Sequence, residues 1–130
     1  MTEPIQVQLK KGVLELCVLA VLSRGENYAY EIANRLAENI GMGEGTIYPL
    51  MRRMQSDGLV STYLRESANG PPRKYYCLTD NGRAAFIAQR SEWEIFERAV
   101  KKILETSDEP RNVSVTAKGS AARPAGTGRR

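Results

Sequence analysis

The chain has 130 residues, of which 42% are hydrophobic, and its formal net charge is +4. This length predicts one domain with a single core, and the composition argues against a chain that is disordered throughout. No segment approaches the ~20 unbroken apolar residues of a membrane span, and residues 1–10 lack the order of a signal peptide, so we expect a cytoplasmic protein.

The residues that most enzymes and metal sites need are missing or scattered. Histidine, the commonest general base and a common zinc ligand, is absent, and the acidic residues form no cluster along the sequence. The two cysteines, Cys17 and Cys77, form no Cys-x-x-Cys pair and lie in apolar runs, so we expect buried, reduced thiols. The sequence therefore predicts neither an enzyme nor a protein with a metal or another cofactor.

The excess positive charge is concentrated at the end of the chain. Five basic and two acidic residues lie between Asp108 and Arg130, which leaves 14 basic and 13 acidic residues before them. Residues 107–130 contain almost no large apolar side chain, so we expect a disordered basic tail that either adds attraction to phosphates or only aids solubility. Because the rest of the chain is almost neutral, a nucleic-acid function has to be inferred from where its cations lie.

Residues 5–23 have the periodicity of a helix, with Leu9, Val13 and Leu16 along one face. Other apolar residues lie on the remaining sides, so this helix has to be covered around most of its surface. In a small domain, we expect a partner subunit to cover the face that carries these three residues. Gly25 is suited to the left-handed conformation that ends a helix.

Two further helices are expected, over about residues 29–40 and 45–56, with Gly41 ending the first of them. A link of about four residues joins them, which predicts a helix-turn-helix. The second of these two helices has a clear apolar face that we assign to the core. That face consists of Ile47, Leu50, Met51 and Met54.

The opposite side of the helix over residues 45–56 is polar, aromatic and cationic, with no acidic residue between Thr46 and Ser56. Arginine, glutamine, tyrosine and threonine are the residue types that contact phosphates and base edges, although an ordinary solvated face has the same composition. Because a helix tolerates proline only in its first turn, Pro49 predicts that this helix starts near residue 45. The candidate DNA contacts of this helix are Thr46, Tyr48, Pro49, Arg52, Arg53 and Gln55.

After Gly58 the periodicity changes to that of strands. Residues 59–65 and 74–78 are β-branched and aromatic runs, separated by turn-rich residues 66–73. A hairpin directly after a recognition helix is a wing, so the predicted fold is mainly α with a small β-hairpin. Its tip carries the basic residues Arg65, Arg73 and Lys74 against the acidic Glu66. Such a basic tip can approach the DNA backbone or the minor groove; the alternative is a hairpin that only closes the domain.

Thr79 can cap a last helix that continues to about residue 106, and such a helix is ~40 Å long. An apolar heptad stripe runs along it, interrupted at Gln89. The stripe contains Phe86, Trp93, Phe96, Val100 and Ile103. A three-helix core of this size cannot cover the whole stripe, so we expect dimerisation. The expected organisation is a winged helix-turn-helix domain over 1–79, a dimerisation helix over 80–106 and a tail over 107–130.

Three segments carry a family resemblance: EGTIYPLMRRM over residues 44–54, PRKYYCLTDNG over residues 72–82 and NYAYEI over residues 27–32. In that order, they resemble the recognition helix, the wing with the entry to the last helix, and the opening of the second helix in the PadR family of transcriptional regulators. The resemblance covers about residues 5–106. The single long C-terminal helix is similar to that of the shorter subfamily.

The resemblance implies a homodimeric winged helix-turn-helix repressor that binds a palindromic operator in double-stranded DNA. In this family the tyrosine of the recognition helix and the basic residues of the wing contact DNA, and the matching positions are Tyr48, Arg73 and Lys74. Tyr28, in the segment that resembles the opening of the second helix, completes the candidate DNA-binding set. The alternative function is a winged-helix module that binds another protein and no DNA; an acidic outer face or a neutral wing would favour it.

The resemblance also implies that a small aromatic or cationic effector often releases the repressor from DNA. Some short members bind flat aromatic compounds between the last-helix tryptophans of the dimer, and Trp93 occupies the similar place. Trp93 and Phe96 are therefore the candidate effector-binding residues. The alternative is a tryptophan that only fills the dimer interface.

Overall fold

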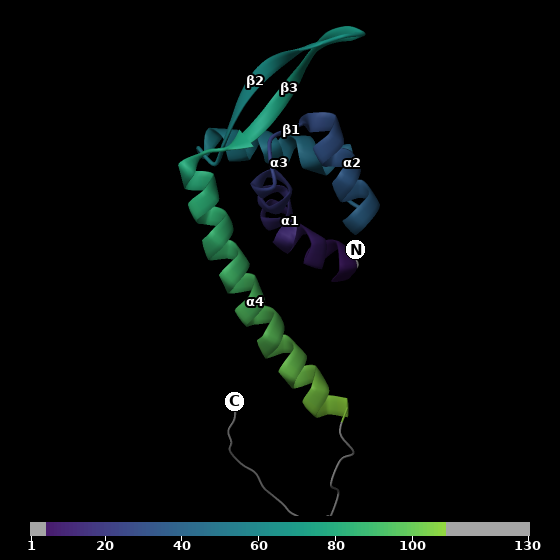
Figure 1. Cartoon of the computed structure of the whole chain (residues 1–130). Coiled ribbons are helices and arrows are strands. Elements are labelled where there is room, and N and C mark those ends of the chain that lie inside the picture. The colour runs from purple at the N-terminus through teal and green to yellow at the C-terminus, as the bar shows by residue number, and fades with distance from the viewer. Residues whose placement is uncertain (1–4, 109–130) are drawn as a thin grey trace, which may run out of the picture. The chain divides into compact units, whose positions relative to one another are not determined.

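The structure, a computed structural model, describes residues 5–108. The contacts between residues define two compact units, and the boundary between them lies within the last helix. The first unit ends at Glu94 and the second begins at Ile95. Figure 1 shows the elements as a coloured ribbon. They are α1 (Ile5–Ser23), β1 (Asn27–Tyr28), α2 (Ala29–Ile40), α3 (Glu44–Ser56), β2 (Val60–Ser67), β3 (Gly70–Leu78) and α4 (Asp80–Asp108). The expected fold, mainly α with a β wing, is confirmed.

The core of the first unit lies among α1, α2, α3 and the base of the sheet. In α1, Leu14, Val18 and Leu22 are spaced by four residues and are all buried, so one face of this helix packs inward. All four residues of the predicted core face of α3 are buried as well. Because the face of α3 follows the helical period, the sequence predicted it correctly.

The end of α2 follows its sequence signal closely. Gly41 adopts φ 71°, a left-handed conformation, and its N–H donates to the carbonyl oxygen of Ala37 at 3.0 Å. Met42 then turns back into the core, where it is 7% exposed. This buried methionine was not predicted, because a residue in a short link belongs to no periodic pattern.

The prediction that Pro49 lies in the first turn of the recognition helix is wrong. α3 begins at Glu44, which places Pro49 in the second turn. Since proline has no N–H, the carbonyl oxygen of Gly45, four residues earlier, lacks its usual helical donor. Gly45 and Pro49 are both exposed, so water can hydrogen-bond that carbonyl and the helix tolerates the proline.

The sheet contains one strand more than the predicted hairpin, and its order is β1-β3-β2. β1 pairs antiparallel with β3, and Tyr28 lies opposite Tyr75. On the other side of β3, Tyr75 lies opposite Tyr63 of β2. β1 was missed because two residues are too few to display an alternating pattern.

The predicted loop over residues 66–73 is too long. β2 continues to Ser67 and β3 begins at Gly70, so only two residues form the turn. Pro71 and Pro72 belong to β3, in a stretch that pairs with β2 alone. The edge of β3 that faces away from β2 has no partner strand there, so it needs no N–H donor. The long hairpin of β2 and β3 extends beyond α1, α2 and α3 (Figure 1).

The predicted cap at Thr79 is confirmed. Its hydroxyl oxygen accepts a hydrogen bond from the N–H of Gly82 at 2.9 Å and donates to the carbonyl oxygen of Gly58 at 2.6 Å. Gly82 is buried directly against the backbone of Leu59. The start of α4 is therefore attached to the segment that links α3 to the wing.

α4 ends two residues later than predicted, at Asp108, so Ser107 and Asp108 are helical and do not belong to a tail. The remainder of the predicted tail, residues 109–130, lies outside the described residues. In the second unit, the described residues are those of α4 from Ile95 onward.

The two cysteines are free, as predicted. They are half-buried and not fully buried, because Cys17 lies at the margin of the α1 core face and Cys77 faces Ser61 across the hairpin. Burial raises the pKa of the Cys17 thiol.

Candidate nucleic-acid interface

The outer face of α3 presents exposed polar side chains, as predicted from its sequence. Thr46, Pro49 and Arg52 are exposed, and Tyr48 is half-buried against the core. Tyr48 and Arg52 are four residues apart, so they lie one turn from each other on the same side of the helix. No carboxylate of the described residues forms an ion pair with Arg52. Its guanidinium is therefore available to an external acceptor.

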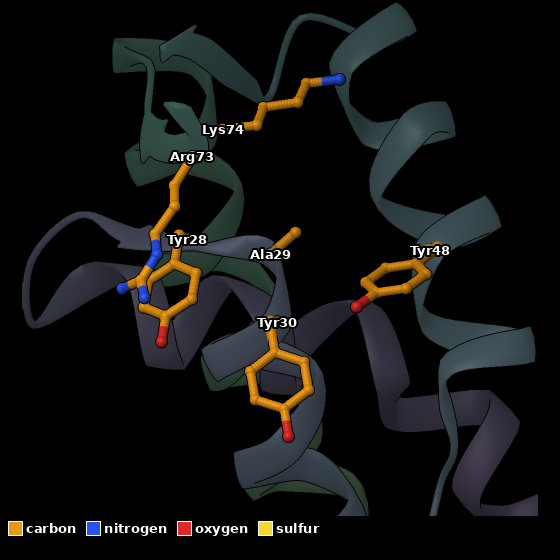
Figure 2. Close-up of a pocket in the computed structure, with 6 residues that line it drawn as sticks. All are labelled: Tyr28, Ala29, Tyr30, Tyr48, Arg73 and Lys74. Carbon is orange, nitrogen blue, oxygen red and sulfur yellow. The ribbon is translucent and has the colours of Figure 1, made fainter. Parts of the chain in front are cut away.

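A hollow of about 460 Å³ opens between the start of α2, α3 and β3. Its lining consists of Tyr28, Ala29, Tyr30, Tyr48, Arg73 and Lys74. In Figure 2 the hydroxyl of Tyr48 points from α3 toward Ala29 and Tyr30, and the guanidinium of Arg73 lies beside the ring of Tyr28. Four predicted DNA contacts from three elements thus meet at one site.

The hollow combines positive charge with phenol hydroxyl groups. The guanidinium carbon of Arg73 lies 4.6 Å from the ring centroid of Tyr28, and the Nζ of Lys74 lies 5.5 Å from that of Tyr76. Within the described part of the chain, neither cation forms an ion pair with a carboxylate. Cations together with hydroxyl donors match the needs of a phosphate group.

Tyr48 keeps its proton at this site. Burial, with a smaller contribution from the carboxylate of Glu44, raises the pKa of Tyr48 above its ordinary value. Both effects disfavour the phenolate, so the hydroxyl remains a hydrogen-bond donor over the physiological pH range.

Arg53 and Gln55 are exposed, but both are engaged by the protein. The Nη2 of Arg53 lies 3.8 Å from the Oε1 of Glu15 in α1, and the Nε2 of Gln55 donates to the Oγ1 of Thr62 in β2 at 3.2 Å. Glu15 also accepts a hydrogen bond from Gln89 at 2.7 Å, which gives a structural reason for the polar residue in the apolar stripe. These two candidate DNA contacts do not line the hollow.

Sequence reasoning missed Tyr30 at the hollow, and it missed the contacts of Glu26 with Tyr63 and Arg65 beside the wing. Tyr30 lines the hollow and is 55% exposed, and its signal was a second tyrosine in the segment NYAYEI. Glu26 accepts hydrogen bonds from the hydroxyl of Tyr63 and from Arg65, the latter at 2.5 Å. The bond to Glu26 is the main reason why the pKa of Tyr63 is raised. No sequence signal connects residues so far apart in the chain.

The candidate dimer-interface residues are apolar and largely uncovered in the single chain. Leu9 is 63% exposed, while Val13 and Leu16 are half-buried on the side of α1 that faces away from the core. In α4, Phe86 packs partly against the core of its own chain, and Trp93 is 39% exposed. The other stripe residues are exposed too, and they are Phe96, Val100 and Ile103.

Other kinds of site find no support in the part of the chain that the structure describes. No group of three or more cysteine, aspartate or glutamate side chains there could hold a metal ion. None of the helices over residues 5–108 combines the length and the hydropathy needed to cross a membrane.

Known proteins share this architecture and sequence. The transcriptional regulator PadR-like family matches residues 18–88. A PadR-like transcriptional regulator from Bacillus cereus is 38% identical, with a TM-score of 0.69 over 75% of this chain and 96% of its own. A PadR family regulator from Eggerthella lenta is 36% identical, with a TM-score of 0.68 over 77% of this chain and 88% of its own.

Two curated relatives match at lower sequence identity. An uncharacterised protein of Lysinibacillus sphaericus is 24% identical over 105 residues, which are 78% of this chain and 96% of that protein. The transcriptional regulator YqjI of Escherichia coli is 30% identical over 95 residues, which are 69% of this chain and 44% of YqjI. The matched family and the shared fold agree, and the chain belongs to the PadR-like family of transcriptional regulators, which are not enzymes.

Proposed function

We propose that this protein is a sequence-specific DNA-binding transcriptional repressor that binds a palindromic operator as a homodimer. The observation that carries the proposal is the hollow beside α3, where Tyr28, Tyr48, Arg73 and Lys74 converge from three elements. Two cations that form no ion pair with a carboxylate of residues 5–108, together with several phenol donors, suit the sugar–phosphate backbone. Arg52, one turn along α3 from Tyr48, is exposed, as a residue that contacts base edges from a recognition helix has to be.

Phosphate contacts and base contacts have different roles in recognition. Phosphate contacts at the hollow supply affinity and fix the position of the protein on the duplex, but they do not report the sequence. Arg52 and Thr46, on the exposed side of α3, are the candidates for contacts with base edges, where arginine pairs best with guanine. Repression then follows if the operator overlaps a promoter.

The homodimer and the effector are also parts of the proposal. The exposed apolar stripe of α4 and the apolar outer face of α1 each support a twofold partner, because exposed apolar patches mark interaction sites. Within that partnership we assign residues 80–106 to the dimerisation helix. Trp93 and Phe96 supply the aromatic surface on which a small aromatic or cationic effector would release the protein from DNA.

The test compares three variants on a duplex selected by the protein from a random-sequence pool, and on a scrambled duplex of equal length. We expect Arg52→Ala to lose affinity for the selected duplex by about 1–3 kcal/mol and to bind the scrambled duplex as before. Lys74→Ala should weaken both duplexes alike and reduce the log–log salt slope by about 0.9. Arg83→Ala removes an exposed arginine of α4 outside the interface, and it should bind as the unmodified protein does.

The proposal is wrong if Arg52→Ala and Lys74→Ala bind both duplexes as tightly as Arg83→Ala does. If the unmodified protein retains no duplex at low salt but binds a protein partner in a fixed ratio, the winged helix is a protein-interaction module.

A further inference from the structure

The wing carries two arginines, of which only one forms an ion pair with a carboxylate of the described residues. Arg65 of β2 and Arg73 of β3 lie directly opposite each other in the strand register. Like charges at such a pair repel each other and destabilise a hairpin. Arg73 lines the hollow without a carboxylate partner in the described chain, whereas Arg65 is held by Glu26.

Glu26 reaches Arg65 across the central strand of the sheet. It lies directly before β1, on one side of β3, while Tyr63 and Arg65 project from β2 on the other side. The guanidinium of Arg65 lies over the ring of Tyr75, with 4.2 Å between its carbon and the ring centroid, and it donates to Glu26 at 2.5 Å.

Tyr63 closes the network. Its hydroxyl oxygen accepts a hydrogen bond from Arg65 at 2.7 Å, and its proton is donated to Glu26. Its ring stacks on Tyr75 at 5.7 Å between centroids. The ring centroids of Tyr75 and Tyr28 lie 5.6 Å apart, and the guanidinium of Arg73 lies over the ring of Tyr28. The network therefore joins the outer strand of the wing to one wall of the hollow.

We infer that Glu26 and Arg65 are positioning residues for DNA binding: together they fix the angle of the wing and keep Arg65 off the DNA backbone, so that Arg73 alone of the pair contacts phosphate. This inference rests on the proposed function. An exposed ion pair contributes little to global stability. Variants of Glu26 and Arg65 therefore fold, and the effect falls on the orientation of the wing.

The salt slope and the sequence preference separate a positioning residue from a phosphate contact. Arg73→Gln loses a phosphate contact, so its slope falls by about 0.9. Arg65→Gln keeps the slope of the unmodified protein but loses roughly tenfold in preference for the selected over the scrambled duplex, because the wing has to be ordered on binding. Glu26→Gln frees Arg65 for a new phosphate contact, so its slope becomes steeper by about 0.9 while the same preference is lost.

Glu66→Gln is the matched control. It removes the same charge as Glu26→Gln, at an exposed residue of β2 that forms no ion pair with any described residue. It should retain the full preference between the two duplexes. The inference is overturned if Arg65→Gln lowers the salt slope as Arg73→Gln does, or if Glu26→Gln behaves as Glu66→Gln does.

A measurement without DNA keeps this inference separate from the proposed function. Hydrogen exchange of the backbone amides in β2 and β3 should be roughly tenfold faster in Glu26→Gln and Arg65→Gln, and unchanged in Glu66→Gln. If no variant binds duplex but the exchange rates rise as stated, the function is wrong and the network stands. Unchanged exchange in both variants overturns the network itself.

Discussion

The substitution Gly82→Ala should destabilise the protein strongly, although it adds a single methyl group. A Cβ at this position would lie 2.0 Å from the carbonyl oxygen of Leu59 and 3.1 Å from the Cδ2 of Leu78. Real Cβ atoms do not approach within 3.0 Å, so α4 and the segment after α3 would have to separate by about 1 Å. Both atoms that block the methyl group most closely belong to the backbone of Leu59, and backbone cannot rotate away as a flexible side chain can.

The cost follows from what that separation breaks. The N–H of Thr79 donates to the carbonyl oxygen of Leu59 at 3.1 Å, and the hydroxyl of Thr79 donates to that of Gly58 at 2.6 Å. Losing both bonds costs about 1 kcal/mol each, and overpacking costs about 1–3 kcal/mol more. The total, about 3–5 kcal/mol, corresponds to a fall in melting temperature of roughly 15–25 °C for a domain of this size.

Thermal unfolding followed by circular dichroism measures this change, at one fixed protein concentration because a dimer melts in a concentration-dependent way. Gly45→Ala is the matched control: no atom lies within 4 Å of its added Cβ, and alanine is the better helix former. We expect its stability to be unchanged or slightly raised. Equal melting temperatures for the two variants would refute the close approach of α4 to Leu59.

Three further predictions address a thiol, a hydroxyl and the dimer. Cys17 should react with iodoacetamide at pH 8.5 more slowly than it does in the urea-unfolded chain, because its raised pKa leaves less thiolate; equal rates by mass spectrometry would contradict this. Tyr63, whose pKa is raised on folding, contributes stability that is present below its unfolded pKa of about 10 and is lost as the pH rises through its folded pKa. Denaturant titrations from pH 8 to pH 11 should therefore show a smaller loss in Tyr63→Phe, and identical pH profiles would argue against the bond to Glu26. Ile103→Glu should convert the proposed dimer to a folded monomer in sedimentation, because Ile103 is 70% exposed in the single chain, whereas Lys102→Glu should remain dimeric; a dimeric Ile103→Glu protein would exclude this stripe as the interface.

The helices and the core face of α3 were predictable because periodicity is a local property of the sequence. Ile47, Leu50, Met51 and Met54 recur at helical spacing, and all are buried. Met42 shares that core, but it lies in a link of three residues with no period. The two-residue strand β1 was missed for a similar reason, since it exists only through its pairing with β3.

The wing and the site were predictable in part. Pro71 and Pro72 indicated a loop, yet the structure places them in β3, where no second strand requires their N–H groups. The family resemblance implied that Tyr48 and Arg73 both contact DNA, and in the structure both line one hollow. The link between Glu26 and Arg65 depends on a sheet register that joins distant parts of the chain, and no local pattern records it.

The measurement that tests the central claim most directly is the selection of duplexes by the full protein from a random-sequence pool, followed by the stoichiometry of the selected complex. The proposed function predicts an enriched inverted repeat with half-sites centred about 10–10.5 base pairs apart, or a multiple of that spacing, bound by two protomers. A pool that shows no enriched sequence after repeated rounds, or a single half-site bound by one protomer, would contradict it.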